Sequence, residues 1–317
     1  MMESGMTWGQ VLAEGQERLK NAGVAEYSLD AWYLFEHAFG ISRMQYFMCS
    51  AQKAEPEEAS WREFEDGIAR RAQREPLQHI LGTQEFMGLE FYVNRHTLIP
   101  RQDTETLVET VLGNHKEKEI KLLDMCTGSG CIAVSLTAHG GYAHVEAADI
   151  SKEALHVAEK NAEKLLSGRQ LIPASESANV EKDPAAATGR EMIRFRHSDM
   201  FSAFYETEDR FDIIVSNPPY IPSDVIEELE PEVRDFEPRS ALDGTADGLF
   251  FYELLARECG RFLKENGAVY FEIGHDQGEA VKQLLDAQGF IDTRVIKDLA
   301  GNDRVVCGRW QNIHCLV

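Results

Sequence analysis

The sequence has few cysteines, and their spacing suits neither a disulfide framework nor a metal site. Its six cysteines are scattered along 317 residues without a C-x-x-C pair, so we expect reduced and mostly structural thiols. The ten histidines show no H-E-x-x-H or similar ligand spacing. The sequence therefore predicts no bound metal.

Long apolar runs are also missing. No segment approaches the ~18 to 20 apolar residues that a membrane-spanning helix needs. The first residues, Met1 to Gly5, lack the basic and then apolar pattern of a signal peptide. We therefore expect a cytoplasmic protein with no membrane partner.

Positive charge is the third deficit. The chain has 32 Lys and Arg against 54 Asp and Glu, which gives a formal net charge of −22. Nucleic-acid binders draw most of their non-specific affinity from Lys and Arg that neutralise phosphates. The balance disfavours DNA or RNA as a direct partner, although a local basic groove could exist, and a basic protein partner fits better.

The length of the chain favours two domains, since single domains usually span roughly 100 to 200 residues. Residues 1–75 have the periodicity of short amphipathic helices. Thr7 with Gln10 and Ser42 with Gln45 form capping-box patterns, which mark helix N-termini. We therefore predict a small all-helical domain over residues 1–75.

The pattern changes after residue 75. Alternating apolar residues and glycines over residues 76–98 predict a β-hairpin that links two domains. From residue 99 to residue 317, strands and helices alternate, which predicts an α/β domain with a mainly parallel, doubly wound sheet. Predicted strands are 120–125, 144–149, 193–197, 211–216, 268–273, 293–296 and 304–308, and predicted helices are 131–138, 153–165, 249–263 and 279–287. Residues 168–190 lack periodicity and are interpreted as a mobile surface insertion.

A glycine loop follows the first strand of this domain. Residues 122–130 read Leu-Leu-Asp-Met-Cys-Thr-Gly-Ser-Gly and lead from a strand into a helix, the context of a nucleotide-type loop. Gly128 and Gly130 remove the β-carbons that would keep a ligand from the backbone. The G-x-G-x-x-G fingerprint is incomplete because Ala133 occupies its third position. A tight strand-to-helix turn without a ligand is the alternative.

Acidic residues at the next two strand ends strengthen the ligand interpretation. Asp149 lies 19 residues after Gly130, close to the ~20-residue spacing at which an acid reaches ribose hydroxyls. The alternative for Asp149 is an acid at a helix N-terminus beside Ser151. After the third strand, Asp199-Met200-Phe201 could contact an adenine, or Asp199 could simply cap a turn.

The fourth strand ends in Asn217-Pro218-Pro219-Tyr220, at the edge where open α/β sheets bind ligands. The prolines fix φ and present carbonyls without competing N–H donors. Asn217 and the Pro218 carbonyl could each accept one hydrogen from a planar –NH₂ group, and Tyr220 could cover its face. Such acceptors favour positive charge on a nitrogen that attacks a sulfonium methyl group. A proline-rich strand terminator without function is the alternative.

With these motifs, the chain resembles the glutamine-N5 methyltransferases that modify peptide-chain release factors, the PrmC/HemK family. The resemblance covers nearly the whole chain. Its specific pieces are Glu75-Pro76-Leu77-Gln78-His79-Ile80-Leu81-Gly82, Leu98-Ile99-Pro100-Arg101 with Thr104-Glu105, the glycine loop, Asn217-Pro218-Pro219-Tyr220-Ile221, Glu237-Pro238 with Ala241-Leu242, Asp247-Gly248-Leu249, Glu272-Ile273-Gly274 with Gln277, and Gly301-Asn302-Asp303-Arg304.

The resemblance implies a Rossmann-like class I methyltransferase domain, preceded by a helical substrate-recognition domain and a connecting hairpin. It implies transfer of a methyl group from S-adenosylmethionine, with S-adenosylhomocysteine as product, to the glutamine of a Gly-Gly-Gln loop on a release factor. The catalytic residues carried over are Asn217, Pro218, Pro219 and Tyr220. The cofactor-binding residues are Asp124, Thr127, Gly128, Ser129, Gly130, Asp149, Ile150, Asp199, Met200, Phe201 and Asn217. The substrate-binding residues are Arg101, Thr104, Asn217, Pro218, Pro219, Tyr220 and Glu237.

The chain departs from the family pattern in two places. Gln102-Asp103 replaces the usual Pro-Glu after Arg101, and the 168–190 insertion is longer than the family norm.

Simpler interpretations of the carried-over residues also stand. Arg101 could form a surface salt bridge, and Glu237 could pair with Arg239 or Arg234 in solvent. Glu272 could support the residues that line the site without contacting the substrate.

Two rival functions use part of the same pattern. An adenine amino-group methyltransferase acting on DNA or RNA could use the same clamp, because a flipped base also presents a planar –NH₂. Residues 1–75 hold 13 acidic and 8 basic residues, whereas a domain that reads nucleic acid should be basic. An adenosine-binding regulatory module would need the glycine loop alone, so the added clamp disfavours it.

Overall fold

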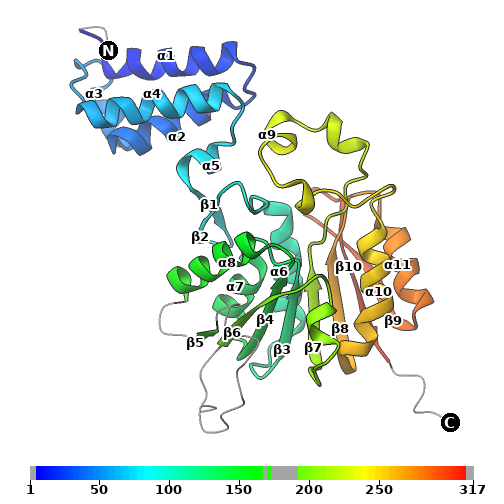
Figure 1. The fold of residues 1–317 in the computed structure, drawn as a ribbon. Coiled ribbons are helices and arrows are strands. Elements are labelled where there is room, and N and C mark those ends of the chain that lie inside the picture. Colours follow the sequence, from blue (N-terminus) through cyan, green and yellow to red (C-terminus); the bar gives the residue numbers. More distant parts are fainter. Residues whose placement is uncertain (1–4, 167–169, 173–191, 312–317) are drawn as a thin grey trace, which may run out of the picture. The chain divides into compact units, whose positions relative to one another are not determined.

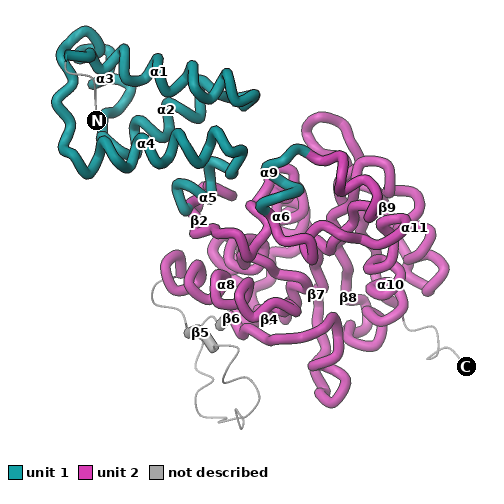
Figure 2. The backbone as a smooth tube through the Cα atoms, turned by 45° about the horizontal axis from the view of Figure 1, so that its top comes forward, with its two compact units in different colours: residues 1–82, 230–236 teal, residues 83–229, 237–317 magenta. Residues whose placement is uncertain are grey.

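The computed structural model describes residues 5–166, 170–172 and 192–311. The chain divides into two compact units (Figure 2). The first unit combines Met1–Gly82 with the distant segment Glu230–Phe236, and the second combines Thr83–Leu229 with Glu237–Val317. The unit boundary therefore lies past residue 75, and a short piece of the later sequence belongs with the N-terminal helices.

The first unit is all helical. Its helices are α1 (Trp8–Asn21), α2 (Tyr27–Phe39), α3 (Arg43–Cys49), α4 (Glu58–Ala72), α5 (Leu77–Leu81) and, within the distant segment, α9 (Pro231–Arg234). The predicted capping boxes at Thr7 and Ser42 are both present. Phe35, Phe64 and Ile68 are at most 2% exposed and form the centre of its core.

Helix α5 corrects one sequence prediction. Ile80 and Leu81 were expected to begin the β-hairpin, but they lie in a helical turn that packs on the helical core. Gly82 ends this turn with φ of +75°, a conformation that glycine adopts without steric cost. The hairpin begins one residue later, with β1 (Thr83–Phe86) paired antiparallel to β2 (Leu89–Tyr92).

A buried ion network joins the distant segment to the helices of the first unit. Arg71 Nε donates to Asp30 Oδ2 at 2.7 Å, and Arg71 Nη2 donates to Glu232 Oε1 at 2.8 Å. Arg74 Nε also donates to Glu232 Oε1, at 2.6 Å. Burial raises the pKa of Asp30, although Arg71 opposes the rise. The segment Glu230–Phe236 is thus anchored on helix α4.

The second unit contains an eight-stranded sheet with the order β5-β6-β4-β3-β7-β8-β10-β9. Its strands are β3 (Lys121–Met125), β4 (His144–Asp149), β5 (Gln170–Ile172), β6 (Met192–His197), β7 (Phe211–Ser216), β8 (Leu263–Glu272), β9 (Phe290–Lys297) and β10 (Asp303–Trp310). The strands from β5 to β8 in this order pair in parallel, whereas β10 pairs antiparallel with both β8 and β9. The predicted α/β class with a mainly parallel sheet is confirmed.

Helices cover both faces of this sheet (Figure 1). They are α6 (Gln102–Asn114), α7 (Cys131–Ser135), α8 (Lys152–Leu165), α10 (Phe250–Phe262) and α11 (Gly278–Ala287), with a short π-helix at Leu136–Gly140 and 3₁₀ turns at Ser202–Phe204, Val225–Glu228 and Arg239–Ala241. Helices α6, α7 and α8 bury apolar residues in one core cluster, and α10 and α11 bury theirs in another. Two cores on opposite faces make the sheet doubly wound, as predicted.

The region predicted to be an insertion without regular structure is corrected in part. Residues 170–172 form edge strand β5, which pairs in parallel with β6. Residues 168–169 and 173–190 lie outside the described residues. None of the helices described is long and apolar enough to cross a membrane.

Candidate active site

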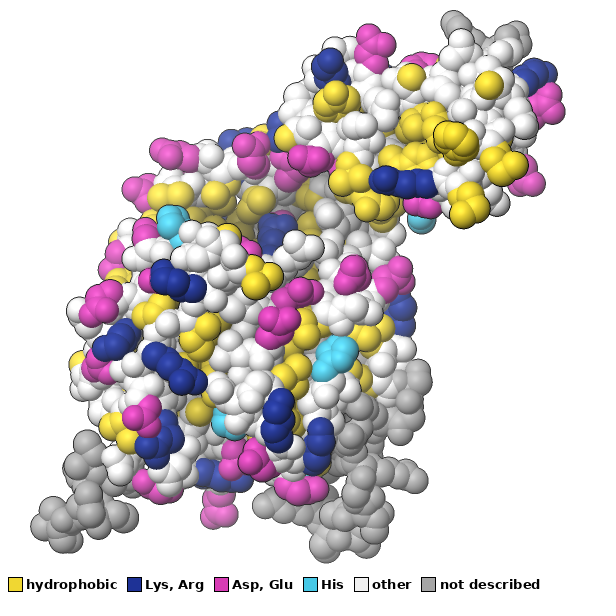
Figure 3. Space-filling view, turned by 180° about the vertical axis from the view of Figure 1, so that it is seen from behind, with side chains coloured by type: hydrophobic (Ala, Val, Ile, Leu, Met, Phe, Trp, Pro, Cys, Tyr) yellow, Lys and Arg dark blue, Asp and Glu magenta, His cyan; other side chains and the backbone are white. Residues whose placement is uncertain are grey.

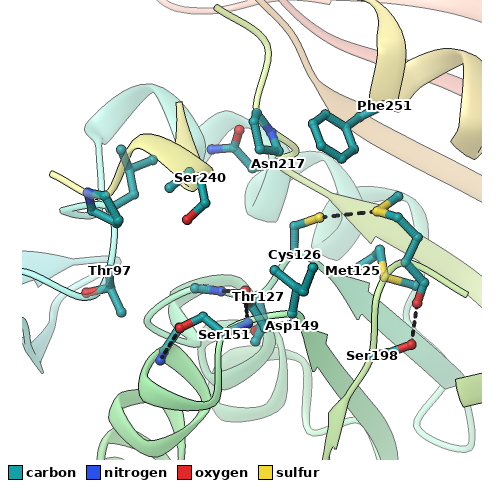
Figure 4. A pocket seen from close by; sticks show the side chains of 18 of the residues that line it. Thr97, Met125, Cys126, Thr127, Asp149, Ser151, Ser198, Asn217, Ser240 and Phe251 are labelled. Atoms are coloured by element: carbon teal, nitrogen blue, oxygen red, sulfur yellow. Dashed lines mark hydrogen bonds between the residues drawn. The ribbon is translucent and has the colours of Figure 1, made fainter. Parts of the chain in front are cut away.

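A cavity of about 590 Å³ opens at the carboxyl ends of β3, β4, β6 and β7. Open α/β sheets bind ligands at this edge. Figure 4 shows Asn217 across the cavity from Thr127, Asp149 and Ser151. Of the predicted site residues, the lining includes Arg101, Thr104, Thr127, Gly128, Ser129, Asp149, Ile150, Asp199, Met200, Phe201, Asn217 and Pro219. It does not include Asp124, Gly130, Pro218, Tyr220 and Glu237.

Two glycines shape the glycine loop, and a side chain would be unfavourable at each for a different structural reason. Gly128 has φ of +57°, and a β-carbon there would meet nothing within 4 Å, so its backbone faces open space. Gly130 has φ of +79°, and a β-carbon there would lie 2.9 Å from the Ala158 Cβ on α8. Gly128 therefore suits close approach of a ligand, and Gly130 permits close packing of the loop on the next helix.

Asp124 supports the loop from beneath. Its side chain is fully buried, and its Oδ2 accepts hydrogen bonds from Thr127 Oγ1 at 2.6 Å and from the Ala133 N–H at 3.2 Å. Burial raises the pKa of Asp124 to about 7. Its contacts tie the loop to the first turn of α7, which explains why the residue does not line the cavity.

Asp149 joins the loop to the start of α8. Its Oδ2 accepts from the Gly128 N–H at 2.9 Å, and its Oδ1 accepts from the Ser151 N–H at 2.8 Å. Ser151 in turn caps α8 by accepting from the Ala154 N–H at 3.1 Å. Burial raises the pKa of Asp149, and these backbone donors oppose the rise. Each carboxylate oxygen keeps a further lone pair for a ligand hydroxyl.

An apolar wall completes this half of the cavity. Met200 and Phe201 line it after β6, with Asp199 beside them. Phe250, Phe251 and Leu254 on α10 also line it, and the sequence analysis did not identify these three residues. No local sequence pattern marks these residues, because their place at the cavity depends on where α10 packs; Phe250 is 48% exposed.

The turn Asn217–Tyr220 follows β7 and reaches the same cavity. It is called the acceptor turn below. Asn217 Nδ2 donates to Thr104 Oγ1 on α6 at 3.4 Å. Tyr220 is packed behind the turn, and burial raises the pKa of its hydroxyl to about 12. Asn217 and Pro219 thus line the cavity, whereas Tyr220 is packed behind the turn.

Side chains and glycines from later in the sequence fix this turn. Gln277 Nε2 donates to the Tyr220 carbonyl at 3.0 Å and to the Gly248 carbonyl at 3.3 Å. Gly248 has φ of +73°, and a β-carbon there would lie 2.3 Å from the Tyr220 carbonyl oxygen. The Ile221 N–H donates to the Leu242 carbonyl at 3.0 Å. The backbone around Tyr220 therefore has little freedom to shift.

Arg101 and Glu237 form an ion pair at the rim. Arg101 Nη2 donates to Glu237 Oε1 at 2.6 Å, with the Arg101 side chain 41% exposed and that of Glu237 1% exposed. Glu237 Oε2 is buried and has no hydrogen-bond partner within the described part of the chain. Burial raises the pKa of Glu237, although Arg101 opposes the rise. Glu237 thus pairs with Arg101 and not with Arg239, which pairs with Glu227 and Asp243.

The departure from the family pattern after Arg101 also has a structural place. Asp103 Oδ2 lies 3.0 Å from Arg304 Nη2, so the unusual acid pairs with an arginine on β10. Asp298 contacts the same arginine at 3.1 Å. Asp103 is therefore part of an ion cluster with Arg304 and Asp298 and does not line the cavity.

The parallel sheet, the glycine loop with its acid, and the acceptor turn define a class I methyltransferase. Residues 10–82 match a family model described as the PrmC N-terminal domain, and residues 102–228 match one described as the methyltransferase small domain.

Comparison with curated proteins identifies the family. The release factor glutamine methyltransferase of Caulobacter vibrioides is 39% identical over 294 residues, 92% of this chain and 93% of that protein. The one from Geobacter sulfurreducens is 39% identical and covers 92% of each chain. The one from Clostridium botulinum is 36% identical, over 94% of this chain and 98% of that protein. The chain belongs to the release factor glutamine methyltransferase family.

The cofactor of this methyltransferase family is S-adenosylmethionine, and the cavity offers groups that fit it. The open space over Gly128 leaves room for a ligand against the backbone. The free lone pairs of Asp149 suit two vicinal ribose hydroxyls. Met200 and Phe201 provide apolar surface for an adenine ring. No described feature of the lining conflicts with this group.

Proposed function

We propose that the chain transfers a methyl group from S-adenosylmethionine to the side-chain amide nitrogen of the glutamine in the Gly-Gly-Gln motif of peptide chain release factors. The observation that carries this proposal is the placement of Asn217. Its –NH₂ group is directed to Thr104, which leaves Oδ1 as the free acceptor, and it shares one cavity with Asp149. An acceptor in that place suits a substrate nitrogen that carries two hydrogens.

The proposed mechanism follows from the weak nucleophilicity of an amide. The nitrogen lone pair is shared with the carbonyl, as the ~18 to 20 kcal/mol barrier to rotation shows. Asn217 Oδ1 and the Pro218 carbonyl would each accept one N–H of the glutamine amide. These bonds strengthen as positive charge develops on the nitrogen, so they stabilise the transition state more than the bound substrate. When bound, S-adenosylmethionine supplies an electrophilic methyl group on its sulfonium.

Orientation provides the second contribution. The prolines and the contacts of Gln277 and Gly248 hold the acceptor turn in one conformation. Holding two reactants in line is worth up to ~7 to 11 kcal/mol in favourable cases. The methyl–sulfur bond breaks as the methyl–nitrogen bond forms, and the cationic nitrogen then releases one proton to water, so the amide need not be deprotonated beforehand.

The rim residues are proposed to receive the substrate loop. Arg101 is partly exposed at the cavity, and its partner Glu237 keeps one buried oxygen that has no hydrogen bond to any residue the structure describes. An unpaired buried carboxylate oxygen is costly unless a ligand donor meets it. We therefore assign Arg101 and Glu237, with Thr104, to binding of the substrate loop.

The helical domain of residues 1–75 is proposed to recognise the rest of the release factor. Figure 3 shows apolar side chains exposed on the helical unit. Met44, Phe47 and Met48 on α3 are 80%, 86% and 77% exposed, and exposed apolar groups of this size mark protein interaction surfaces. The net charge of −22 favours a basic protein partner over nucleic acid.

A methyl-transfer assay tests the function. Radiolabelled S-adenosylmethionine is offered with a release factor that carries the Gly-Gly-Gln loop and, in parallel, with duplex DNA. We expect label in the release factor and none in the DNA. Label in DNA together with an unlabelled release factor would overturn the proposal and favour an adenine amino-group methyltransferase.

A further inference from the structure

The segment Glu230–Phe236, teal in Figure 2, belongs to the helical unit, although the residues on either side of it, Leu229 and Glu237, belong to the second unit. The segment contains the helical turn α9, in which Pro231 occupies the first helical position. Proline is favoured there because its fixed φ suits a helix start and its missing N–H needs no partner. The segment is therefore locally ordered, and the helical unit determines where it lies.

Two acids on this segment are held by two arginines at the end of α4. Arg74 grips Glu232 with two parallel hydrogen bonds, from Nε to Oε1 and from Nη2 to Oε2, both 2.6 Å. Arg74 Nη2 also donates to Glu230 Oε2 at 2.8 Å. Arg71 Nη2 adds a bond of 2.8 Å to Glu232, and the side chains of this pair are only 8% and 17% exposed. Paired bonds of this kind between an arginine and a carboxylate fix geometry as well as charge.

The backbone of Arg74 is also unusual. Arg74 lies just past the end of α4 with φ of +69°, the left-handed conformation that glycine usually adopts at this place. An arginine is strained there because its β-carbon crowds the backbone. A guanidinium thus occupies a position whose backbone suits glycine, and that guanidinium binds both acids of the segment.

The position of the segment affects the cavity rim through Glu237, the residue that follows it. Consecutive Cα atoms are about 3.8 Å apart, so a displacement of Phe236 also moves Glu237. The Glu237 side chain is 1% exposed, and its Oε1 accepts from Arg101 Nη2 at 2.6 Å. A hydrogen bond this short weakens steeply when its atoms move out of line.

The acceptor turn is insulated from the same displacement. After the turn, the Ile221 N–H donates to the Leu242 carbonyl at 3.0 Å, and the Ser223 N–H donates to the Thr245 carbonyl at 2.9 Å. Both bonds lie within the second unit and hold the chain before it reaches the segment. A shifted segment should therefore disturb the rim and leave Asn217 in place.

We propose that Arg71, Arg74 and Glu232 are positioning residues for substrate binding, because they hold Glu230–Phe236 on the helical unit and thereby keep Glu237 where the substrate loop docks. This role rests on the proposed function, since it matters only if Glu237 receives the release-factor loop. None of the three is among the described residues that line the cavity. They act through the chain and do not touch the substrate.

The primary test is Arg74→Gly, which removes the guanidinium and leaves a residue that suits the backbone. At saturating S-adenosylmethionine we expect the KM for the release factor to rise roughly fivefold, the lower end of couplings between separate sites. The kcat and the Kd for S-adenosylmethionine should stay close to their wild-type values. Tm should fall little, because glycine relieves the backbone strain as the ion pairs are lost. An unchanged KM, or a loss in kcat instead of KM, would overturn the role.

A second variant and a control address general damage to the helical unit. Glu232→Gln removes one charge at constant shape, and Arg71 keeps Asp30 as a partner at 2.7 Å. We expect KM to rise here as well. Arg18→Gln is the matched control, because Arg18 pairs with Glu65 on α4 at 3.0 Å within the same unit. Its KM should stay at the wild-type value, and an equal rise would contradict a specific role of the segment.

A double variant tests whether the effect passes through Glu237. Glu237→Gln should itself raise the KM for the release factor. If Arg74 acts through Glu237, combining Arg74→Gly with Glu237→Gln should raise KM little beyond Glu237→Gln alone. Fully additive effects would show that Arg74 affects the release factor independently of Glu237, and they would refute the positioning role.

The two proposals fail in different ways. A wild-type enzyme that leaves release factors unmethylated would refute the proposed function. An active wild-type enzyme whose KM is unaffected by both Arg74→Gly and Glu232→Gln would refute only the positioning role.

Discussion

The two halves of the cavity are held together by different means. In the cofactor half, backbone groups make the main contacts, as the Gly128 N–H donates to Asp149 and the Thr127 N–H to the Ala148 carbonyl. In the acceptor half, side chains from distant elements hold the turn, chiefly Thr104 from α6 and Gln277 before α11. Changes in the first half should therefore affect binding, and changes in the second should affect turnover.

The largest effect is expected from Asn217→Ala. Removing one preorganised acceptor should lower kcat on the order of 100-fold or more, because the lost hydrogen bond is strongest in the transition state. Cofactor affinity should barely change. Steady-state kinetics and calorimetry check the two quantities, with Asn114→Ala at the end of α6 as a control that should keep normal turnover. A variant that lost affinity instead of turnover would remove the contrast between the two halves.

The cofactor half gives the complementary change. Asp149→Ala should weaken S-adenosylmethionine binding by ~1 to 3 kcal/mol, the range for hydrogen bonds to charged groups. The kcat at saturating cofactor should fall much less than in Asn217→Ala. Calorimetric titration measures the affinity, and an unchanged value would contradict the assignment of Asp149 to the ribose.

The smallest effect is a difference in stability between two glycine variants, one at a glycine packed against the acceptor turn and one at a glycine away from it. Gly248→Ala and Gly301→Ala both place a β-carbon at positive φ, but only Gly248 faces a backbone atom, the Tyr220 carbonyl oxygen. We expect Gly248→Ala to lower the free energy of unfolding by about 1 kcal/mol more than Gly301→Ala, because overlap adds to backbone strain. Urea unfolding compares them. Equal losses would show that the turn tolerates displacement.

The sequence was sufficient for features that depend on neighbouring residues. The glycine loop and the capping boxes at Thr7 and Ser42 are local patterns, and the structure contains both helix caps. The strand β7 was found because its centre, Ile213-Ile214-Val215, is a continuous apolar run, as is typical of a buried parallel strand. Asn217 was found because the four residues of its motif, Asn217-Pro218-Pro219-Tyr220, are consecutive in the sequence.

Contacts between residues far apart in sequence were not predictable in the same way. The ion pair between Arg71 and Glu232 places Glu230–Phe236 in the helical unit, and neither residue carries a local signal of its partner. Gln277, which precedes α11, reaches the acceptor turn only because the sheet brings β8 beside β7. The helical state of Ile80 and Leu81 was missed because a short apolar run near glycine fits both a strand and a helical turn.

The position of the transferred methyl group tests the central claim most directly. A release factor incubated with the enzyme and S-adenosylmethionine is digested, and mass spectrometry locates the methyl group. We predict a single methyl group on the side-chain nitrogen of the glutamine in the Gly-Gly-Gln loop, and none on a release factor in which that glutamine is replaced by glutamate. Methylation at another residue, or equal methylation of the glutamate variant, would contradict transfer to the amide nitrogen of that glutamine.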